Sequence, residues 1–320
     1  MVQEYLTDSL RDTNDAAVRE IVDFLLVAPG KRLRPALVLL SAQAAKGGGN
    51  GTSRLPRASA HVAAAVELIH MASLVHDDLV DAAAVRHHRP SVQAKWDASV
   101  AVAVGDYLCA RAFQLVACCA DPRLFGVLGP HLCAMCEGEL MQVIDRHNFH
   151  LSERRCLAMA EKKTAALFGA CCGAGALTVG GKPGICLALQ EFGLHFGIAF
   201  QLLDDCRDLL SDQEGLGKTP GQDLLAGDVT LPLLYLIRYG WGRAAEPQPR
   251  QGNPVGARGL AHLSNSFRAS PAPAQVAAVI TAHLDQARQA LRALADSDFK
   301  NDLRQLADHL AVTAADILAR

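Results

Sequence analysis

Six aspartates in two identical arrangements are the residues whose types and spacing are best suited to chemistry. Residues 77–81 and 204–208 both read D-D-x-x-D, and each arrangement follows an apolar run with helical periodicity. At about 1.5 Å of rise per residue, the first and last aspartates of one cluster share a helix face, about 6 Å apart along the axis. A single cluster of this kind is typical of a solvated surface, whereas two in one helical chain require a counter-charge. Carboxylate oxygens with open coordination sites suit Mg²⁺ that bridges to a phosphate-bearing substrate, so the predicted metal ligands are Asp77, Asp78, Asp81, Asp204, Asp205 and Asp208.

Cationic residues occur beside each cluster and in two further segments. The stretch "PGKRLRP" at 29–35 precedes a predicted helix, Arg86 follows the first aspartate cluster, "EKKTAALFG" begins at 161, and Lys218 follows the second cluster. Each alone is typical of a surface cation. Together with two aspartate clusters, they predict a pocket for two diphosphates. The candidates are Lys31, Arg32, Arg34, Arg86, Lys162, Lys163 and Lys218.

The composition argues against a nucleic-acid partner, a zinc site and a membrane-spanning segment. Half of the 320 residues are hydrophobic, 20% are charged, and the net charge is −2, which gives no reason to expect a nucleic-acid partner. The ten cysteines lie mostly in apolar, helix-like runs and complete no zinc ligand set, so we expect free thiols in a reducing, cytoplasmic compartment. No run of about 18 uncharged apolar residues exists, and we therefore expect no membrane-spanning segment.

Hydrophobic periodicity indicates an all-α protein, because apolar residues recur at helical spacing and alternating strand patterns are scarce. We expect one helical domain over residues 1–320, with a mobile loop at 242–259, where Pro, Gly and Arg are frequent. The predicted helices cover residues 15–28, 35–46, 56–80, 91–119, 123–147, 152–180, 184–211 and 228–240, with a C-terminal helix or pair from about 273.

The motifs, taken in combination, resemble those of the trans-isoprenyl diphosphate synthases, also called the polyprenyl synthetase family. The likeness covers residues 29 to 232 and consists of "GKRLRP", "HDDLVD", "GDYLCARAF", "EGELMQ", "KKTAALF", "FQLLDDCRD", "LGKTPGQDL" and "TLP". It implies an antiparallel helix bundle around a deep central cavity, and a homodimer. It also implies an Mg²⁺-dependent, head-to-tail condensation of isopentenyl diphosphate with an allylic diphosphate such as the dimethylallyl, geranyl or farnesyl compound.

The resemblance also implies roles for individual residues. Asp77, Asp81 and Asp204 correspond to the principal Mg²⁺ ligands, with Asp78, Asp205 and Asp208 in support. For the allylic diphosphate, the implied contacts are Arg86, Lys163 and Lys218. For isopentenyl diphosphate they are Lys31, Arg34 and His70, with His87 at an adjoining position. Gln201 and Thr164 are implied to line the reacting centre.

Two positions depart from the family pattern. The family reads R-R-G where this chain has Arg86-His87-His88, and it usually has Lys where "LAGDVTLP" has Asp228. Histidine does not replace the bidentate fork of arginine. Three hypotheses therefore stay open: a chain-elongating synthase with an adapted isopentenyl diphosphate site, a class I terpene cyclase or atypical prenyl transferase, and a partner subunit of low activity.

The residues before the first aspartate cluster predict the product length. Ala72 and Ser73 lie about one helical turn before Asp77. In the family, bulky aromatics at these positions stop the growing tail early, whereas both side chains are small here. We expect a product longer than C15, with geranylgeranyl diphosphate (C20) favoured and C25 to C40 open.

Overall fold

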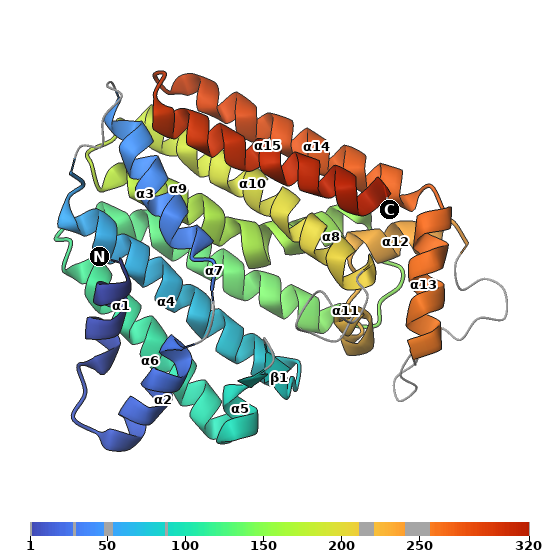
Figure 1. Cartoon of the computed structure of the whole chain (residues 1–320), viewed down its shortest axis with the longest axis horizontal. Coiled ribbons are helices and arrows are strands. Elements are labelled where there is room, and N and C mark those ends of the chain that lie inside the picture. Colours follow the sequence, from blue (N-terminus) through green and yellow to red (C-terminus); the bar gives the residue numbers. More distant parts are fainter. Residues whose placement is uncertain are drawn as a thin grey trace. The chain divides into compact units, whose positions relative to one another are not determined.

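The computed structural model describes residues 2–27, 30–47, 54–86, 89–210, 221–240 and 257–319. Over these ranges the protein is all-α except for one hairpin, in which each strand has two residues (Figure 1). This confirms the predicted fold class. In chain order the elements are α1 (Val2–Arg11), α2 (Ala16–Leu26), α3 (Leu33–Lys46), α4 (Arg57–Val80), β1 (Val85–Arg86), β2 (Arg89–Pro90), α5 (Val92–Lys95), α6 (Ala98–Ala117), α7 (Arg123–Ile144), α8 (Glu153–Ala160), the π-helix η1 (Glu161–Ala165), α9 (Ala166–Leu177), α10 (Pro183–Leu210), α11 (Gln222–Ala226), α12 (Leu231–Arg238), α13 (Ala257–Ala269), α14 (Ala272–Ala290), the 3₁₀ turn η2 (Leu291–Ala293) and α15 (Asp298–Ala319).

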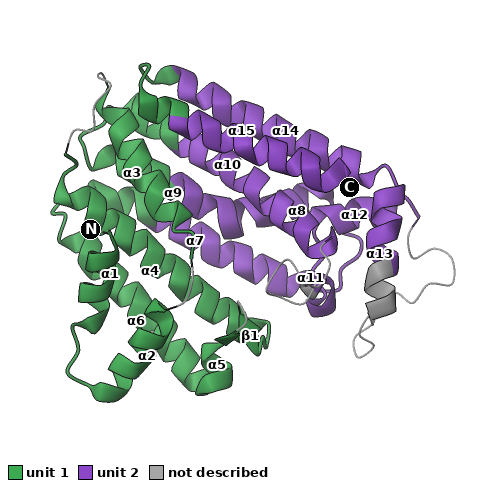
Figure 2. Cartoon of the chain, viewed as in Figure 1, with its two compact units in different colours: residues 1–128, 170–189, 293–301 green, residues 129–169, 190–292, 302–320 purple. Residues whose placement is uncertain are grey.

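The chain forms two compact units, coloured separately in Figure 2. Unit 1 comprises Met1–Leu128, Ala170–Leu189 and Ala293–Asn301, and unit 2 comprises Gly129–Gly169, Gln190–Arg292 and Asp302–Arg320. Helices α7, α9, α10 and α15 contribute residues to both units. The first aspartate cluster belongs to unit 1 and the second to unit 2. The single-domain organisation stays a prediction.

Helix α4 is the core of unit 1 and packs against α1, α3 and α6. Its middle is rich in alanine, and Ala63, Ala64 and Ala65 are fully buried, because short side chains let neighbouring helices approach. Helix α6 approaches α4 closely at Gly105, where an added Cβ would stand only 2.0 Å from the His76 ring. His76 is the residue immediately before the first aspartate cluster, so this contact fixes α4 where the cluster begins.

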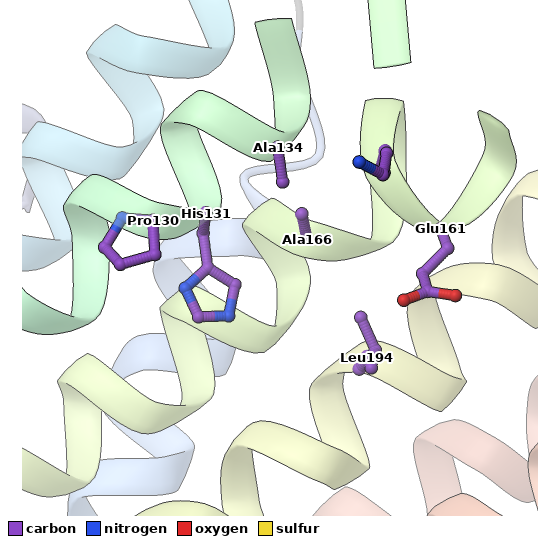
Figure 3. A pocket seen from close by; sticks show the side chains of 7 residues that line it. Pro130, His131, Ala134, Glu161, Ala166 and Leu194 are labelled. Atoms are coloured by element: carbon purple, nitrogen blue, oxygen red, sulfur yellow. The ribbon is translucent and has the colours of Figure 1, made fainter. Parts of the chain in front are cut away.

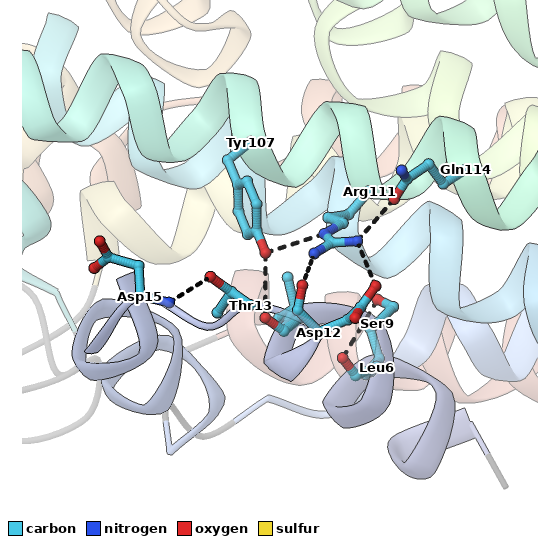
Figure 4. A network of polar contacts seen from close by, with 9 residues as sticks. Leu6, Ser9, Asp12, Thr13, Asp15, Tyr107, Arg111 and Gln114 are labelled. Atoms are coloured by element: carbon cyan, nitrogen blue, oxygen red, sulfur yellow. Dashed lines mark hydrogen bonds and ion pairs between the residues drawn. The ribbon is translucent and has the colours of Figure 1, made fainter. Parts of the chain in front are cut away.

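A polar network joins the end of α1 to α6 in unit 1 (Figure 4). The Arg111 guanidinium donates from Nε to the Tyr107 hydroxyl (3.0 Å) and from Nη1 to Asp12 Oδ2 (3.2 Å). The Tyr107 hydroxyl in turn donates to the Leu10 carbonyl at 3.2 Å. This network satisfies carbonyl groups at the end of α1, which a helix terminus cannot satisfy by itself.

Unit 2 is built around the middle of α10, where aromatic rings form its core. Phe192 and Phe196 stack with centroids 5.8 Å apart, and Phe168 of α9 lies 5.3 Å from Phe200. Helices α14 and α15 run side by side (Figure 1), and Arg288 Nε donates to Asp308 Oδ1 across them at 2.8 Å.

The predicted elements differ from the observed ones at several points. The helix predicted over 91–119 is interrupted at Trp96 and Asp97, because the Asp97 carboxylate accepts from Val100 N and starts α6 afresh. Helix α1 was not predicted. Of the loop predicted at 242–259, residues 242–256 lie outside the described residues, and residues 257–259 begin α13.

Three helices among the described residues, α4, α6 and α10, are long and apolar enough to cross a membrane by length and composition. In the most apolar stretch of 18 residues in α4, 72% is buried, so packing within the protein accounts for much of the apolar character of this helix. The expectation that no segment spans a membrane stays a prediction.

Candidate active site

The first aspartate cluster lies at the C-terminal end of α4. The helix ends at Val80, and the Asp81 backbone N–H caps it by donating to the Asp77 carbonyl at 2.9 Å. Carboxylates at a helix C-terminus are disfavoured by the helix dipole, which leaves the cluster in need of positive charge. Asp78 is buried and already has one cationic partner, because Arg86 Nε donates to its Oδ1 at 2.7 Å.

Arg86 lies in the hairpin β1–β2, directly after the turn that leaves α4. Gln93 Nε2 donates to the carbonyls of Asp78 (2.6 Å) and Ala83 (3.0 Å), and the Ser91 hydroxyl donates to the same Ala83 carbonyl. These bonds satisfy the backbone of the turn that leaves α4. His87 lies outside the described residues, so its role in binding stays a prediction.

A group of arginines surrounds His70, which is half-buried in α4. Burial, and then the charges of Arg34, Arg86 and Arg32, lower the pKa of His70 well below its ordinary value, so the imidazole is neutral at pH 7. A neutral imidazole among several guanidinium groups can donate to an anion without adding to their mutual repulsion. Three of the predicted substrate-binding residues, Arg34, His70 and Arg86, therefore share one electrostatic environment, and Lys31 is exposed.

The ion pair between Arg32 and Glu67 was not assigned from the sequence. Arg32 Nη1 lies 2.5 Å from Glu67 Oε1, and Glu67 is buried in α4. Arg32 adopts the left-handed backbone conformation (φ 50°) just before α3. The sequence signal for this ion pair is Glu67 itself, because it is a charged residue inside the apolar run "AAAVELIHMA".

The second aspartate cluster occupies the last turns of α10 in unit 2. Asp204 is exposed, whereas Asp205 is buried. Burial, together with the carboxylates of Asp204, Asp208 and Asp228, raises the pKa of Asp205 to about 8. A cation bound beside these carboxylates would relieve their mutual repulsion. The segment after the cluster is tied to it, since Gly221 N donates to the Asp208 carbonyl and Asp223 N to the Asp208 carboxylate.

Three predicted residues form a continuous hydrogen-bonded chain in unit 2. The Thr164 hydroxyl donates to Gln201 Oε1 at 2.6 Å, and Gln201 Nε2 donates to Asp205 Oδ1 at 2.6 Å. The chain begins in the π-helix and ends in the aspartate cluster. The orientation of the Gln201 amide is therefore determined at both ends.

The π-helix η1 carries Lys162, Lys163 and Thr164 and interrupts what the sequence predicts as one continuous helix. Lys163 Nζ lies 2.6 Å from Glu139 Oε2, and Lys162 pairs with Glu137. Gly138, between these two glutamates, allows α7 to pack directly against the π-helix backbone. Single π-turns inside α-helices are frequent at functional sites, because they redirect side chains without ending the helix.

Asp228 has its own partners, which the sequence did not reveal. Arg146 Nε donates to Asp228 Oδ1 at 3.2 Å, and Gln142 Nε2 donates to Oδ2. Asp228 is buried, so the two donors compensate a carboxylate removed from water. The charge reversal at this position is thus accompanied by a cation, Arg146, from the turn that follows α7.

Within the described residues, no three His, Cys, Asp or Glu side chains gather closely enough to hold a metal ion. Lys218 lies outside the described residues, and its role stays a prediction. A small cavity of about 210 Å³ lies in unit 2 and is bordered by His131 of α7 and Glu161 of the π-helix (Figure 3). Of the cationic candidates within the described residues, only Lys162 lines it.

The chain is similar to known proteins over most of its length. The family described as polyprenyl synthetase matches residues 15–247, well over half of the chain. The chain belongs to this family. The heptaprenyl diphosphate synthase component 2 of Geobacillus stearothermophilus is 38% identical over 283 residues, which cover 88% of this chain and 86% of the relative. The short chain isoprenyl diphosphate synthase of Methanothermobacter thermautotrophicus is 32% identical over 316 residues, covering 96% and 94%.

Solved structures of polyprenyl synthetases share the fold. The crystal structure of a polyprenyl synthase from Caulobacter crescentus, complexed with calcium and isoprenyl diphosphate, matches with a TM-score of 0.86 and 31% identity. The match covers 100% of this chain and 93% of the other. This polyprenyl synthetase chain is therefore a prenyltransferase with the all-α isoprenoid synthase fold, and its activity is that of a prenyl diphosphate synthase.

Proposed function

We propose that the protein condenses isopentenyl diphosphate head to tail with an allylic diphosphate, in the presence of Mg²⁺, to give geranylgeranyl diphosphate. The dimethylallyl, geranyl and farnesyl compounds are the proposed allylic substrates. The hydrogen-bonded chain from Thr164 through Gln201 to Asp205 carries this proposal. It joins, in one line, two residues implied to line the reacting centre and one member of an aspartate cluster.

In this reaction the C–O bond of the allylic diphosphate breaks, and the π-bond of isopentenyl diphosphate attacks the resulting allylic carbon. A proton is then lost, and the departed diphosphate is the proposed base. Cations such as Arg86 and Lys163 stabilise the negative charge that develops on the leaving group. Arg86 pairs with Asp78 and Lys163 pairs with Glu139, so both cationic side chains are ordered before the substrate binds. Arg34 and His70 bind isopentenyl diphosphate.

The aspartates favour a hard cation such as Mg²⁺ over a metal that prefers thiolate or imidazole ligands, because every proposed ligand is a carboxylate oxygen. Asp77, Asp81 and Asp204 are the proposed principal ligands, with Asp78, Asp205 and Asp208 in support. The Caulobacter relative is complexed with calcium, which also prefers oxygen ligands. When bound, Mg²⁺ neutralises charge on the diphosphate oxygens.

The C20 product is proposed from the residues that precede Asp77. Ala72 is almost fully buried, and the Ser73 hydroxyl donates to the His70 carbonyl at 2.9 Å. Both side chains are small, so neither forms a bulky barrier. The relatives do not decide the length, since one is a heptaprenyl and another a short chain synthase. Products of C25 to C40 are the alternative outcomes.

The deciding experiment incubates the purified chain with Mg²⁺ and allylic diphosphates of several lengths, with and without isopentenyl diphosphate. Longer prenyl diphosphates formed only when isopentenyl diphosphate is present support the proposal. Hydrocarbons or alcohols formed without it indicate a terpene cyclase instead. The length of the longest product identifies the chain-length class directly.

A partner subunit is the second candidate, favoured by one observation. The Geobacillus relative is component 2 of its enzyme. If this chain also needs another component, it will show no turnover alone under conditions in which it binds both substrates. Turnover by the purified chain alone excludes that requirement.

We also propose that the chain forms a homodimer. In unit 1, Phe113 and Phe125 are 45% and 41% exposed and stack on each other with centroids 6.4 Å apart. In unit 2, α7 exposes Leu140 and Ile144, at 61% and 74%. Large apolar side chains left in water favour association. Light scattering should give twice the monomer mass, and Phe113→Glu or Ile144→Glu should shift it towards the monomer.

A further inference from the structure

Two ion pairs connect α7 to the π-helix, one on each side of Gly138. An added Cβ at Gly138 would stand 2.3 Å from Lys163 N and 2.9 Å from Lys162 C, the two atoms of one peptide bond. Glu137 pairs with Lys162. Glu139 pairs with Lys163, whose Nζ lies 2.6 Å from Oε2. Because two positions of an α-helix are about 200° apart around its axis, the two glutamates leave α7 in nearly opposite directions.

The two ion pairs differ in their surroundings. Lys162 lines the cavity of unit 2 together with Glu161 (Figure 3), and the Lys162 and Glu137 side chains are 37% and 58% exposed. Such an exposed pair contributes little in water. Lys163 and its partner are only 22% and 23% exposed. Lys163 also directly precedes Thr164, whose hydroxyl begins the hydrogen-bonded chain to the second aspartate cluster.

The Glu139 carboxylate is not satisfied by this ion pair alone. Its Oε1 atom is buried and accepts no hydrogen bond from the described residues. A buried carboxylate oxygen without a donor is unfavourable for folding, so stability alone does not explain a glutamate at this position. Its partner Lys163 has an ammonium with three donors, and a fixed acceptor for one of them orients the group without excluding a contact with a diphosphate oxygen.

We propose that Glu139 is a positioning residue that directs Lys163 to the diphosphate of the allylic substrate. It touches no reacting atom. By ordering a long, flexible lysine in advance, it reduces the conformational entropy that is lost when the substrate binds. The same ammonium then stabilises the charge that passes to the departing diphosphate. The inference rests on the proposed function, because an allylic diphosphate is the ligand that Lys163 is proposed to bind.

The test is calorimetric titration of the full chain with geranyl diphosphate and Mg²⁺, without isopentenyl diphosphate, so that no condensation is needed. Glu139→Met should weaken binding about tenfold, which is the value of one hydrogen bond to a charged group. The thermal midpoint should stay near that of the native chain, because the unsatisfied buried oxygen is removed as well. Glu139→Gln keeps an oxygen that accepts from the ammonium and should recover most of the affinity. In steady-state assays of Glu139→Met, kcat should fall while the KM for isopentenyl diphosphate is unchanged.

Glu137→Met is the matched control, since it removes the partner of the neighbouring lysine two positions along the same helix. Its affinity and rate should equal those of the native chain. A second comparison uses Lys163→Met. Because Glu139 acts through Lys163, the double variant Glu139→Met, Lys163→Met should bind no more weakly than Lys163→Met alone.

Three results would overturn the proposal: native affinity in Glu139→Met, an equal loss in Glu137→Met, or a double variant that binds more weakly than Lys163→Met. If Glu139→Met does not fold, Glu139→Asp replaces it, since the shorter carboxylate does not reach Lys163 and should give the same loss. Failure of the proposed function differs, because it appears as absent condensation in a native chain that still binds geranyl diphosphate.

Discussion

Gly138 of α7 lies against the backbone of Lys163 in the π-helix, so closely that an added Cβ would stand 2.3 Å from Lys163 N. The atom in the way belongs to the backbone and cannot rotate aside. Gly138→Ala should therefore displace the π-helix, with a loss of about 1–3 kcal/mol in unfolding free energy and a marked loss of turnover. Urea denaturation and steady-state rates measure both effects.

The control for this substitution is Gly126→Ala on the same helix, where an added Cβ meets nothing within 4 Å. Alanine is the better helix former, so this variant should gain about 0.5–1 kcal/mol and keep full activity. A Gly138→Ala enzyme with native rate and stability would show that the contact is unimportant.

Asp77→Ala and Asp204→Ala should abolish turnover while the helical fold persists. Neither side chain is buried, and each carboxylate is repelled by its neighbours in the absence of a cation. We expect a rate reduction of at least about 100-fold together with an unchanged or slightly raised thermal midpoint. Circular dichroism and product formation are measured on the same samples. Activity that survives at saturating Mg²⁺ would refute the metal assignment.

Ala72→Phe should shorten the product towards C15 at a similar initial rate. The position is 1% exposed, so a phenyl ring there has to displace neighbouring side chains and would narrow the path that we propose for the tail. Chromatography of the dephosphorylated products gives the length. If the ring cannot be accommodated and the variant unfolds, Ser73→Phe at the half-buried next position tests the same wall. An active, folded variant with an unaltered product would place the tail elsewhere.

The imidazole pair of His195 and His283 should make stability depend on pH. Their Nδ1 atoms lie 3.0 Å apart, and burial followed by the neighbouring His195 lowers the pKa of His283 to about 4. Between pH 6.5 and 4 the unfolded chain therefore binds a proton that the folded chain does not. The folded state loses stability as pH falls through this window, by about 2–3 kcal/mol in total, and this contribution is constant above pH 6.5.

Urea denaturation of His283→Gln measures that contribution. The variant should lose less stability than the native chain between pH 7 and pH 4.5, since glutamine does not titrate. Glu191 and Glu161 act in the opposite direction on His195, whose pKa is nevertheless lowered by burial. Identical pH profiles for the two proteins would contradict the expected role of the pair.

Asp228→Lys should destabilise the protein more than Asp228→Asn. The lysine would bury a second cation beside Arg146, whereas asparagine still accepts a hydrogen bond from Gln142. We expect losses of about 3–5 kcal/mol and about 1–3 kcal/mol respectively. The double variant Arg146→Met, Asp228→Asn should lose less than the sum of the single changes. Strict additivity in urea denaturation would show that the pair is not coupled.

Several features of this protein follow from the sequence alone. The helical period of the apolar residues predicted that α4 ends at the first aspartate cluster, and α4 does end at Val80. The same reasoning located the second cluster at the end of α10. Local patterns can do this because a helix face and a helix end depend on residues within a few turns. The motif set likewise predicted the family, which the comparisons confirmed.

Other features were decided only by tertiary packing. The sequence shows Arg32, Glu67, Arg146 and Asp228 as separate charges, and nothing in their spacing pairs them. The π-helix likewise has no local signature, because it forms where Gly138 and Gly197 let two other helices approach its backbone. Pairing of distant residues depends on which helix faces meet and how closely. Side-chain volumes across the whole core decide that, and no single stretch of chain contains this information.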